Sequence, residues 1–314
     1  MIIPYVMLFI AGIICLLKGS DYVTVYASKL AKHCGVSQLI IGITVVAMST
    51  SLPELTVSIF SLLFETSQIA TGTIIGSNIA NVCLIVGISA LLYPMKTNKN
   101  FLKQGYFTLV FTIAVVLFLM DGMVFYEGAI LVVGFLIYMY YLINLKRKTS
   151  NKQKTKYVKK SEIKKEKKMM IKYIIFSLFG GLIVVVGAQT LIYSTIEIAK
   201  TLGISELLIS LIAIAVGTSL PELAVSFTAA VKKLDGISIG NILGSNIFNI
   251  AILGLVSLFS TVSIINSAVM YNLLIMAVSV IVLLLFIKMR WKISRINGAV
   301  LLLIYAIFIY IQFI

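Results

Sequence analysis

The sequence predicts an all-α polytopic membrane protein with ten transmembrane helices, arranged as two inverted repeats of five helices each. Three observations lead to this prediction: an apolar composition, ten long apolar runs, and motifs repeated in register. The 314 residues are 60% hydrophobic and only 12% charged, with a mean hydropathy of +1.09. Soluble chains carry about twice this share of charge. The composition therefore excludes a soluble domain, a secreted disulfide scaffold and a nucleic-acid-binding domain.

The apolar runs give the number of helices. At about 20 residues per span, they fall near residues 4–26, 38–64, 69–92, 102–120, 124–144, 171–194, 206–231, 237–260, 268–288 and 296–313. The first run continues through Lys18 and Asp21 without a small-residue cleavage site, so it is interpreted as a span and not as a signal peptide. The only histidine, His33, is expected in a loop, and the three cysteines lack the spacing of a metal site.

Basic residues predict the orientation. Residues 146–168 hold twelve basic and two acidic residues, which is +10 of the net charge of +15. Basic loops stay in the cytoplasm, so the chain divides into a first repeat (1–145), a basic cytoplasmic loop (146–170) and a second repeat (171–314). Both termini are then expected outside a cell membrane. A solvated, poorly ordered linker explains the loop better than a lipid-binding or calmodulin-binding site does.

The repeat is visible at a constant offset of 168 residues. Residues 50–55 (TSLPEL) recur as 218–223, residues 76–79 (GSNI) recur as 244–247, and Asn81 matches Asn249. Chance similarity between apolar helices would match Leu and Ile, and not Pro, Glu, Asn and Gly in register. Because each copy has an odd number of spans, the second copy enters the membrane from the opposite side. Such inverted repeats are typical of secondary transporters that bind their substrate between the copies.

Two acidic residues occupy an unusual place. Of eleven acidic residues, only Glu54 and Glu222 lie near the middle of a span. Asp21 is expected to pair with Lys18 near a helix end, and Glu197 is expected near the outer end of the sixth span. A carboxylate at bilayer depth costs at least a few kcal/mol unless it meets a cation, a proton or water. With no Lys or Arg at comparable depth, a mobile cation is the predicted partner.

A proline precedes each of these glutamates. Pro53 and Pro221 remove a backbone donor and interrupt their helices. The carbonyls of residues 47–50 and 215–218 are therefore expected to be free to face a cavity. Each glutamate then begins the half-helix after the break, where the helix dipole favours a negative charge.

Oxygen atoms dominate the predicted site. The candidate ligands are the carboxylates, hydroxyls and amides of Glu54, Glu222, Thr50, Thr218, Ser51, Ser219, Ser77, Ser245, Asn81 and Asn249. An all-oxygen set with two carboxylates suits Ca²⁺ better than Zn²⁺ or copper, and smaller groups of these oxygens suit Na⁺. Each single hydroxyl could instead bond to its own helix, and the motif glycines could serve only helix packing.

At these residues the sequence resembles the cation/calcium exchanger superfamily, whose two repeats each carry a G-[TS]-S-x-P-E element and a G-S-N-x-x-[ND] element. Here they read Ser49 to Glu54 with Gly76 to Asn81, and Gly217 to Glu222 with Gly244 to Asn249. The resemblance covers the whole chain, and it extends to compact prokaryotic sodium/calcium exchangers, which lack the large calcium-sensing domains of animal relatives.

The resemblance implies alternating-access antiport, in which Na⁺ moving inward drives Ca²⁺ outward. It implies Ca²⁺ binding by Glu54 and Glu222, helped by the carbonyls of Thr50 and Thr218, and it makes the first and sixth spans a sliding pair. The implied sodium ligands are Ala47, Ser51, Ser77, Ala215, Ser219 and Ser245, and the implied polar neighbours of the central site are Asn81 and Asn249.

Two residues depart from the family pattern. Ser49 stands where the first motif usually has glycine, and a mild effect on the local backbone is expected. Asn249 stands where some relatives, including potassium-dependent exchangers, have aspartate. A neutral side chain there argues against potassium co-transport.

Other functions receive less support. Proton-coupled Ca²⁺ or Na⁺ exchange remains open because a buried glutamate can bind a proton, although the serines of the motifs favour sodium. A cation channel usually lines its pore with residues of several subunits, and no nucleophile–base pair suggests an enzyme. The expected partners are therefore Ca²⁺, Na⁺ and the lipid bilayer, with no cofactor, no nucleic acid and no obligate protein partner.

Overall fold

The computed structural model describes residues 2–63, 67–151, 160–202, 218–262 and 267–312. Its elements in chain order are α1 (Ile3–Cys34), α2 (Gln38–Ile41), the π-helix η1 (Gly42–Val46), α3 (Ala47–Thr50), α4 (Leu52–Leu63), α5 (Ser67–Ile79), the π-helix η2 (Ala80–Ile85), α6 (Val86–Leu92), β1 (Met95–Lys96), α7 (Lys99–Leu119), α8 (Phe125–Asn151), α9 (Lys160–Thr201), α11 (Leu220–Val231), α12 (Asp235–Ser257), α13 (Ser267–Arg290), β2 (Lys292–Ile293) and α14 (Arg295–Ile311).

Local sequence signals account for several helix ends. Helix α1 has Pro4 in its first turn, where a missing N–H costs nothing, and it stops at Gly35, which adopts the left-handed conformation with φ 63°. Helix α14 begins with a capping box, in which Ser294 and Asn297 bond to each other's backbone N–H. The Asn98 side chain caps α7 by accepting the N–H of Asn100 at 2.9 Å.

Every predicted apolar run contains helix in the described residues, but fewer than ten helices are long enough to span a membrane alone. Among the described residues, seven helices are long and apolar enough to cross a membrane, and an eighth span results if the bent pair 38–50 and 52–63 counts as one. Two of the remaining apolar helices, α11 and α14, are shorter, and the first part of run 206–231 lies outside the described residues. The structure therefore supports a polytopic membrane protein, and a total of ten spans stays a prediction.

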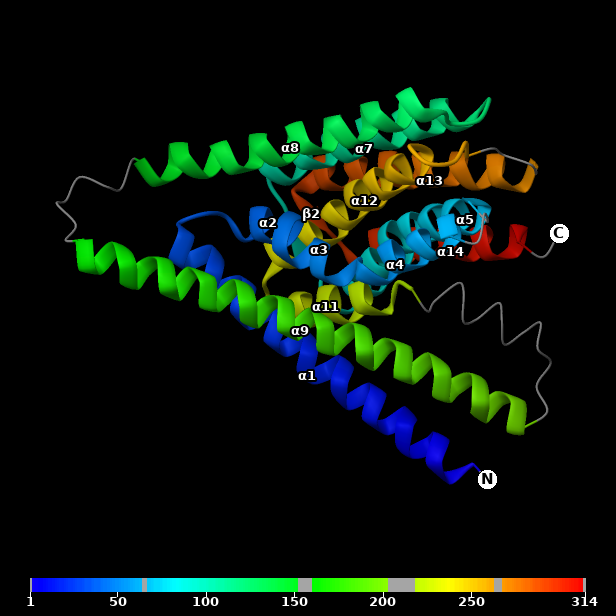
Figure 1. The fold of residues 1–314 in the computed structure, drawn as a ribbon, viewed down its shortest axis with the longest axis horizontal. Helices are drawn as coiled ribbons and strands as arrows, with labels where there is room; N and C mark the ends of the chain where they lie inside the picture. Colours follow the sequence, from blue (N-terminus) through cyan, green and yellow to red (C-terminus); the bar gives the residue numbers. More distant parts are fainter. Residues whose placement is uncertain (1, 64–66, 152–159, 203–217, 263–266, 313–314) are drawn as a thin grey trace.

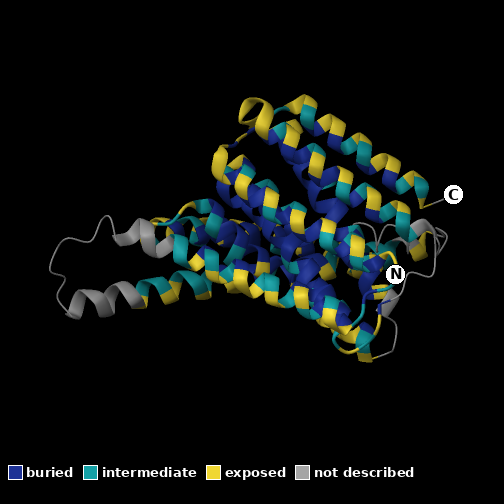
Figure 2. Cartoon of the chain, turned by 90° about the horizontal axis from the view of Figure 1, so that it is seen from above, coloured by how far each residue is buried: buried dark blue, intermediate teal, exposed yellow. Residues whose placement is uncertain are grey.

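Two helical segments form the centre of the molecule. In the most apolar stretch of the continuous helix 69–92 (α5, η2 and α6), 78% of the residues are buried, and in that of α12 the share is 89%. Only 22% of the residues are buried in the corresponding stretches of α1 and α8, and 28% in that of α9, so these helices lie at the periphery. Figure 2 shows buried residues gathered in the middle and exposed residues on the outer faces. Many of these exposed residues are large and apolar, such as Phe259 and Ile296, as expected for a lipid-facing surface.

Helices α1 and α9 lie side by side and run antiparallel (Figure 1). Their contact depends on glycines. A Cβ atom at Gly12 or Gly19 would lie 3.0 Å from the carbonyl oxygen of Gly187 or Gly180, respectively. Small residues of this kind let helix backbones approach closely in membranes. Gly187 matches Gly19 at the offset of 168, so this interface contains glycines that correspond in the sequence repeat.

The structure corrects several sequence predictions. His33 lies in the last turn of α1 and not in a loop, because that helix continues to Cys34. Asp21 pairs with Lys232 at the end of α11, at 2.7 Å between Nζ and Oδ1, and not with Lys18. The described fold is mostly helical as predicted, and the two-residue strands β1 and β2 pair antiparallel. Glu197 does lie near the end of α9, where it pairs with Lys200 at 3.0 Å.

The predicted basic loop is shorter than expected. Residues up to Asn151 continue α8, and residues from Lys160 already belong to α9. Lys and Glu have high helix propensity, which explains why a polar segment extends both helices. Residues 152–159 of this loop lie outside the described residues.

The described chain ends lie on the same side of the molecule. Figure 1 shows the N- and C-terminal ends at the right, whereas α8 ends and α9 begins at the left. This arrangement is compatible with the predicted topology, and the side of the membrane that each end faces stays a prediction.

Candidate functional site

The first half of the site is built around a helix break. Segments 38–50 and 52–63 meet at an angle of 48°. Ser51 lies between them with φ −85° and ψ 20°, which is not helical, and Glu54 occupies the first turn of α4. The break predicted beside Pro53 is therefore present. The π-helix η1 just before it is a second irregularity, of a kind that is frequent at functional sites.

The second half has the same local arrangement in the part that is described. Ser219 is the N-cap of α11, Pro221 lies in the first turn, and Glu222 follows it. Both glutamates are therefore at helix N-termini, where the backbone dipole favours an anion. Ala215 lies outside the described residues.

The two halves meet through their glutamates. Ser51 donates its hydroxyl to Glu222 Oε1 at 2.9 Å, although it is close to Glu54 in the chain. Ser77 on α5 donates to Glu54 Oε1 at 3.1 Å, and its hydroxyl oxygen lies 3.1 Å from that of Thr218. Both carboxylates are completely buried. The structure thus brings together residues that are separated by up to 171 positions.

The asparagines of the second motif lie on the two central helices. Asn81, in η2, donates to Asn246 Oδ1 at 3.0 Å, and Asn249, in α12, donates to Asn78 Oδ1 at 3.1 Å. Neither Asn81 nor Asn249 is exposed. Both therefore lie in the interior, on the two central helices.

The remaining predicted residues have varied surroundings. Thr50 donates to Asn241 Oδ1 at 3.1 Å and also approaches the carbonyls of Val46 and Ala47. The Ala47 carbonyl is not free, because it accepts the N–H of Ser51 at 3.0 Å. The prediction of an unoccupied carbonyl is therefore wrong for Ala47: the chain forms one last helical bond before the break. Ser219 and Ser245 are buried.

Several buried oxygens of these residues have no hydrogen-bond partner in the described part of the chain. They are Glu54 Oε2, Glu222 Oε2, Asn81 Oδ1, Asn249 Oδ1 and Ser245 Oγ. The ion pairs among the described residues are Lys200–Glu197 and Lys232–Asp21, so neither site glutamate has a basic partner there. Buried unpaired acceptors are costly. A cation bound among them would satisfy both the charge and the oxygens.

The side chains at this site do not suit a soft metal ion or a transition-metal ion. The described residues contain no group of three or more His, Cys, Asp or Glu side chains that could hold a metal ion. Two carboxylates among hydroxyls and amides instead form a hard, oxygen-only environment of the kind that suits Ca²⁺ and Na⁺.

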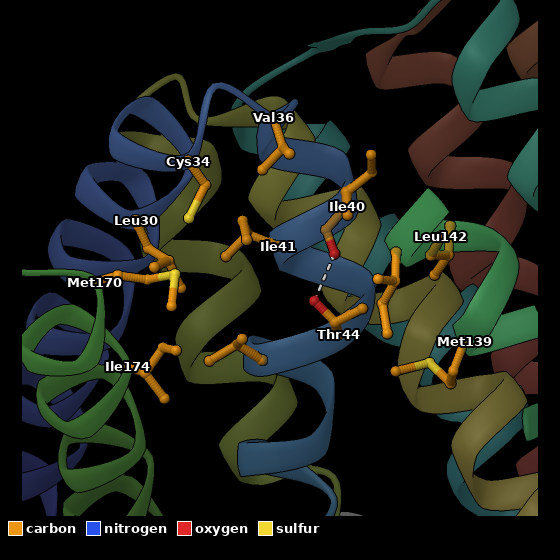
Figure 3. Close-up of a pocket in the computed structure, with 12 residues that line it drawn as sticks. Leu30, Cys34, Val36, Ile40, Ile41, Thr44, Met139, Leu142, Met170 and Ile174 are labelled. Atoms are coloured by element: carbon orange, nitrogen blue, oxygen red, sulfur yellow. Dashed lines mark hydrogen bonds between the residues drawn. The ribbon is translucent and has the colours of Figure 1, made fainter. Parts of the chain in front are cut away.

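A separate pocket, drawn in Figure 3, differs in chemistry. It lies between α1, α2, η1, α8 and α9 and is lined by residues such as Leu30, Ile41, Leu142 and Met170. Its hydroxyl, Thr44 Oγ1, already donates to the Ile40 carbonyl at 2.8 Å. The lining is apolar, and the pocket is therefore a poor place for an ion.

Three asparagines that contact the site were not among the predicted ligands. Asn241 accepts from Thr50 and donates to Ser226 Oγ at 3.0 Å, and Asn78 and Asn246 accept from the two motif asparagines. A signal for the last two was present, because Asn78 and Asn246 belong to the repeated GSN element. Asn241 has threonine at the matching position of the first repeat, so the repeat gave no hint of it.

Comparison with known proteins identifies the family. A family model described as sodium/calcium exchanger protein matches residues 4–144 and 172–314. The chain belongs to the sodium/calcium exchanger family. It is similar to the sodium/calcium exchanger MaX1 of Methanosarcina acetivorans, with 35% identity over 98% of both chains. It is also similar to the putative antiporter CaxA of Alkalimonas amylolytica, with 31% identity over 97% of both.

A solved structure of a sodium/calcium exchanger has the same fold. The sodium-calcium exchanger NCX_Mj soaked with 10 mM Na⁺ and zero Ca²⁺ superposes with a TM-score of 0.85, at 32% identity and over 98% of both chains. This likeness and the apolar helices make the chain a multi-pass membrane transporter of the sodium/calcium exchanger family.

Proposed function

We propose that the protein is a secondary-active antiporter that exchanges Na⁺ for Ca²⁺ across the cell membrane by alternating access. Ca²⁺ binds between Glu54 and Glu222, and Na⁺ binds overlapping groups of the same oxygens. The observation that supports this best is the pair of buried carboxylates, each with one oxygen unpaired and no basic partner in the described residues. Two negative charges balance one Ca²⁺, so a loaded site is close to neutral.

The proposal assigns the finer roles as follows. Carbonyls of Thr50 and Thr218 assist Ca²⁺ binding, and Asn81 and Asn249 contribute amide oxygens. Sodium ligands come from Ser51, Ser77, Ser219 and Ser245, and from the backbone of Ala215, whereas the carbonyl of Ala47 is left out because it already accepts the N–H of Ser51. The ten helices form two inverted repeats, the segment that joins them faces the cytoplasm, and both termini face outward.

Vesicle transport tests the function. Purified protein is reconstituted into vesicles loaded with Na⁺, and Ca²⁺ uptake is followed while the Na⁺ and pH gradients are varied separately. Uptake should follow the Na⁺ gradient and stop when that gradient is removed. Uptake that follows the pH gradient and ignores Na⁺ would contradict sodium coupling and would favour proton coupling.

Neutral variants test the site. Glu54→Gln and Glu222→Gln should each lower uptake to the level of protein-free vesicles, because an amide cannot balance the charge of Ca²⁺. Glu197→Gln is the matched control, since Glu197 pairs with Lys200 near the end of α9, and it should transport normally. Normal uptake by either site variant would contradict the assignment of that carboxylate.

A further inference from the structure

Four asparagines form a hydrogen-bonded network between the two central helices, with a reciprocal pair, Asn78 and Asn246, in the middle. Asn78 Nδ2 on α5 donates to the backbone carbonyl of Asn246 at 3.3 Å, and Asn246 Nδ2 on α12 donates to the backbone carbonyl of Asn78 at 3.4 Å. These two side chains are 1% and 0% exposed, and they correspond at the repeat offset of 168. This central pair is therefore a reciprocal link between the two halves of the chain.

The side-chain oxygens of this central pair hold the other two asparagines. Asn249 Nδ2 donates to Asn78 Oδ1 at 3.1 Å, and Asn81 Nδ2 donates to Asn246 Oδ1 at 3.0 Å. A carboxamide can be reversed with little change of shape, but its nitrogen donates and its oxygen accepts. Because the nitrogen of each outer asparagine faces an oxygen acceptor, its own oxygen must point elsewhere.

The two outer amide oxygens, which point away from this network, have no partner. Asn81 Oδ1 and Asn249 Oδ1 have no hydrogen-bond partner in the described part of the chain, and both residues are fully buried. Asn81 lies four residues after Ser77, which donates to Glu54, so the two share one helix face beside the site. Reversal of either amide would put two carbonyl oxygens against each other and place N–H groups where the unpaired oxygen now lies.

We propose that Asn78 and Asn246 are positioning residues that orient the Asn249 and Asn81 amides, so that both present oxygen to the transported cation. The proposal rests on the proposed function, because it assigns a role at the same site. The pairing is crossed: Asn78 orients Asn249 on the opposite helix, and not Asn81 on its own helix. Outer partners that orient ligands in this way typically change metal affinity by about 10-fold to 100-fold.

The crossed pairing makes a selective prediction. Asn78→Ala removes the Oδ1 atom that accepts the hydrogen bond from Asn249. The backbone carbonyl of residue 78, which accepts the hydrogen bond from Asn246, remains. Asn246 therefore still orients Asn81. The effect of Asn78→Ala should depend on Asn249 and be independent of Asn81, whereas a general weakening of helix packing would show no such preference.

The test is a pair of double-mutant cycles on the full chain in vesicles. The half-saturating Ca²⁺ concentration of Na⁺-driven uptake is measured for Asn78→Ala, Asn249→Ala, Asn81→Ala, and the double variants of Asn78 with each of the others. Asn78→Ala should raise this half-saturating Ca²⁺ concentration by about tenfold. The double variant with Asn249 should match Asn249→Ala within about twofold, and the double variant with Asn81 should show the product of both single effects.

The corresponding double-mutant cycles of Asn246 provide a second, independent test. Asn246→Ala should couple to Asn81→Ala and combine independently with Asn249→Ala. Independent effects in every combination would overturn the proposal. Loss of the folded, monodisperse protein in all Asn78 and Asn246 variants would also overturn it, because the network would then be a structural link only.

The wild type separates this proposal from the function on which it rests. If wild-type vesicles show no Na⁺-driven Ca²⁺ uptake, the proposed exchange fails. The positioning role is then read from the rise in melting temperature that Ca²⁺ causes in the same set of variants, with the same pattern of coupling expected.

Discussion

At the scale of single residues, each site glutamate has one oxygen held by a serine and one oxygen unpaired. Ser51 holds Glu222 Oε1, and Ser77 holds Glu54 Oε1. The serines fix the planes of the carboxylates, so the unpaired oxygens have defined directions. Pre-oriented ligands lower the ordering cost of binding an ion.

The Ser51 hydroxyl should matter more for Na⁺ than for Ca²⁺. Removal of a hydrogen bond to a charged group costs about 1.5–3 kcal/mol, and Ca²⁺ keeps the attraction of two carboxylates whereas a singly charged ion gains less from them. We expect Ser51→Ala to raise the half-saturating Na⁺ concentration by about tenfold or more, with a smaller effect on Ca²⁺. Transport at varied Na⁺ and Ca²⁺ concentrations measures both values.

Ser58 provides the control for this substitution. It is 1% exposed on α4, and its hydroxyl has no hydrogen-bond partner in the described residues. Ser58→Ala should leave both half-saturating concentrations unchanged. Equal effects of Ser51→Ala on the two ions would show that this hydroxyl does not distinguish them.

At the scale of elements, two kinds of contact connect α1 to the second half of the chain. The glycine interface joins it to α9. A polar group joins it to α11: besides the Asp21–Lys232 pair, Ser20 Oγ lies 2.9 Å from Thr228 Oγ1. The ion pair is half exposed and contributes little to stability. Close backbone packing is therefore the main attachment of α1.

Substitution of an interface glycine should destabilise the protein. A Cβ at Gly187 would lie 2.7 Å from Cys15 Cβ and 2.9 Å from the Leu16 backbone nitrogen, so the helices must separate. Overpacking of this kind costs about 1–3 kcal/mol. We expect Gly187→Ala to lower the melting temperature of the detergent-solubilised protein, as followed by static light scattering or intrinsic fluorescence.

Gly134→Ala is the control, because it is expected not to lower the melting temperature. A Cβ there would meet the Phe111 ring at 3.5 Å, an ordinary contact, and Ala favours a helix over Gly by about 1 kcal/mol. Gly134→Ala should therefore keep or raise the melting temperature. An equal decrease in both variants would mean that the α1–α9 contact does not depend on the missing side chain at Gly187.

At the scale of the whole molecule, the arrangement of the chain ends allows a test of orientation. Both ends lie opposite the junction of α8 and α9 in Figure 1. Epitope tags at either terminus should bind antibody on intact cells, because the basic junction is retained in the cytoplasm. A tag inserted between residues 152 and 159 should bind only after permeabilisation. Terminal tags that are protected in intact cells would reverse the proposed topology.

Much of this molecule was predictable from local sequence, and long-range pairing was not. The apolar runs located the helices, and Pro53 located the break, because both effects act within a few residues. Asp21 was assigned to nearby Lys18, but its partner Lys232 lies far along the chain. Spacing alone contains no information on such contacts. For the same reason the sequence did not show that Ser51 bonds to Glu222 and not to Glu54.

Helix ends in the basic region were also missed, for a physical reason. Hydropathy marks where a chain can lie in lipid, and it does not mark where a helix stops. Lys- and Glu-rich segments are good helix formers in water, so α8 and α9 continue past their apolar parts to Asn151 and from Lys160. His33 was placed in a loop by the same reasoning, although α1 ends only at Cys34.

Ser49, which replaces the usual glycine of the first motif, has a matching space opposite it. Its hydroxyl donates to the Val46 carbonyl at 2.7 Å, and a Cβ at Gly181 on α9 would lie 2.7 Å from Ser49 Cβ. At the offset of 168 the order of sizes is reversed in the sequence, with Gly217 in the motif and Ile13 on α1. A side chain at position 181 would occupy the space that Ser49 now fills, so the serine in the motif is compatible with this helix contact only while position 181 is glycine.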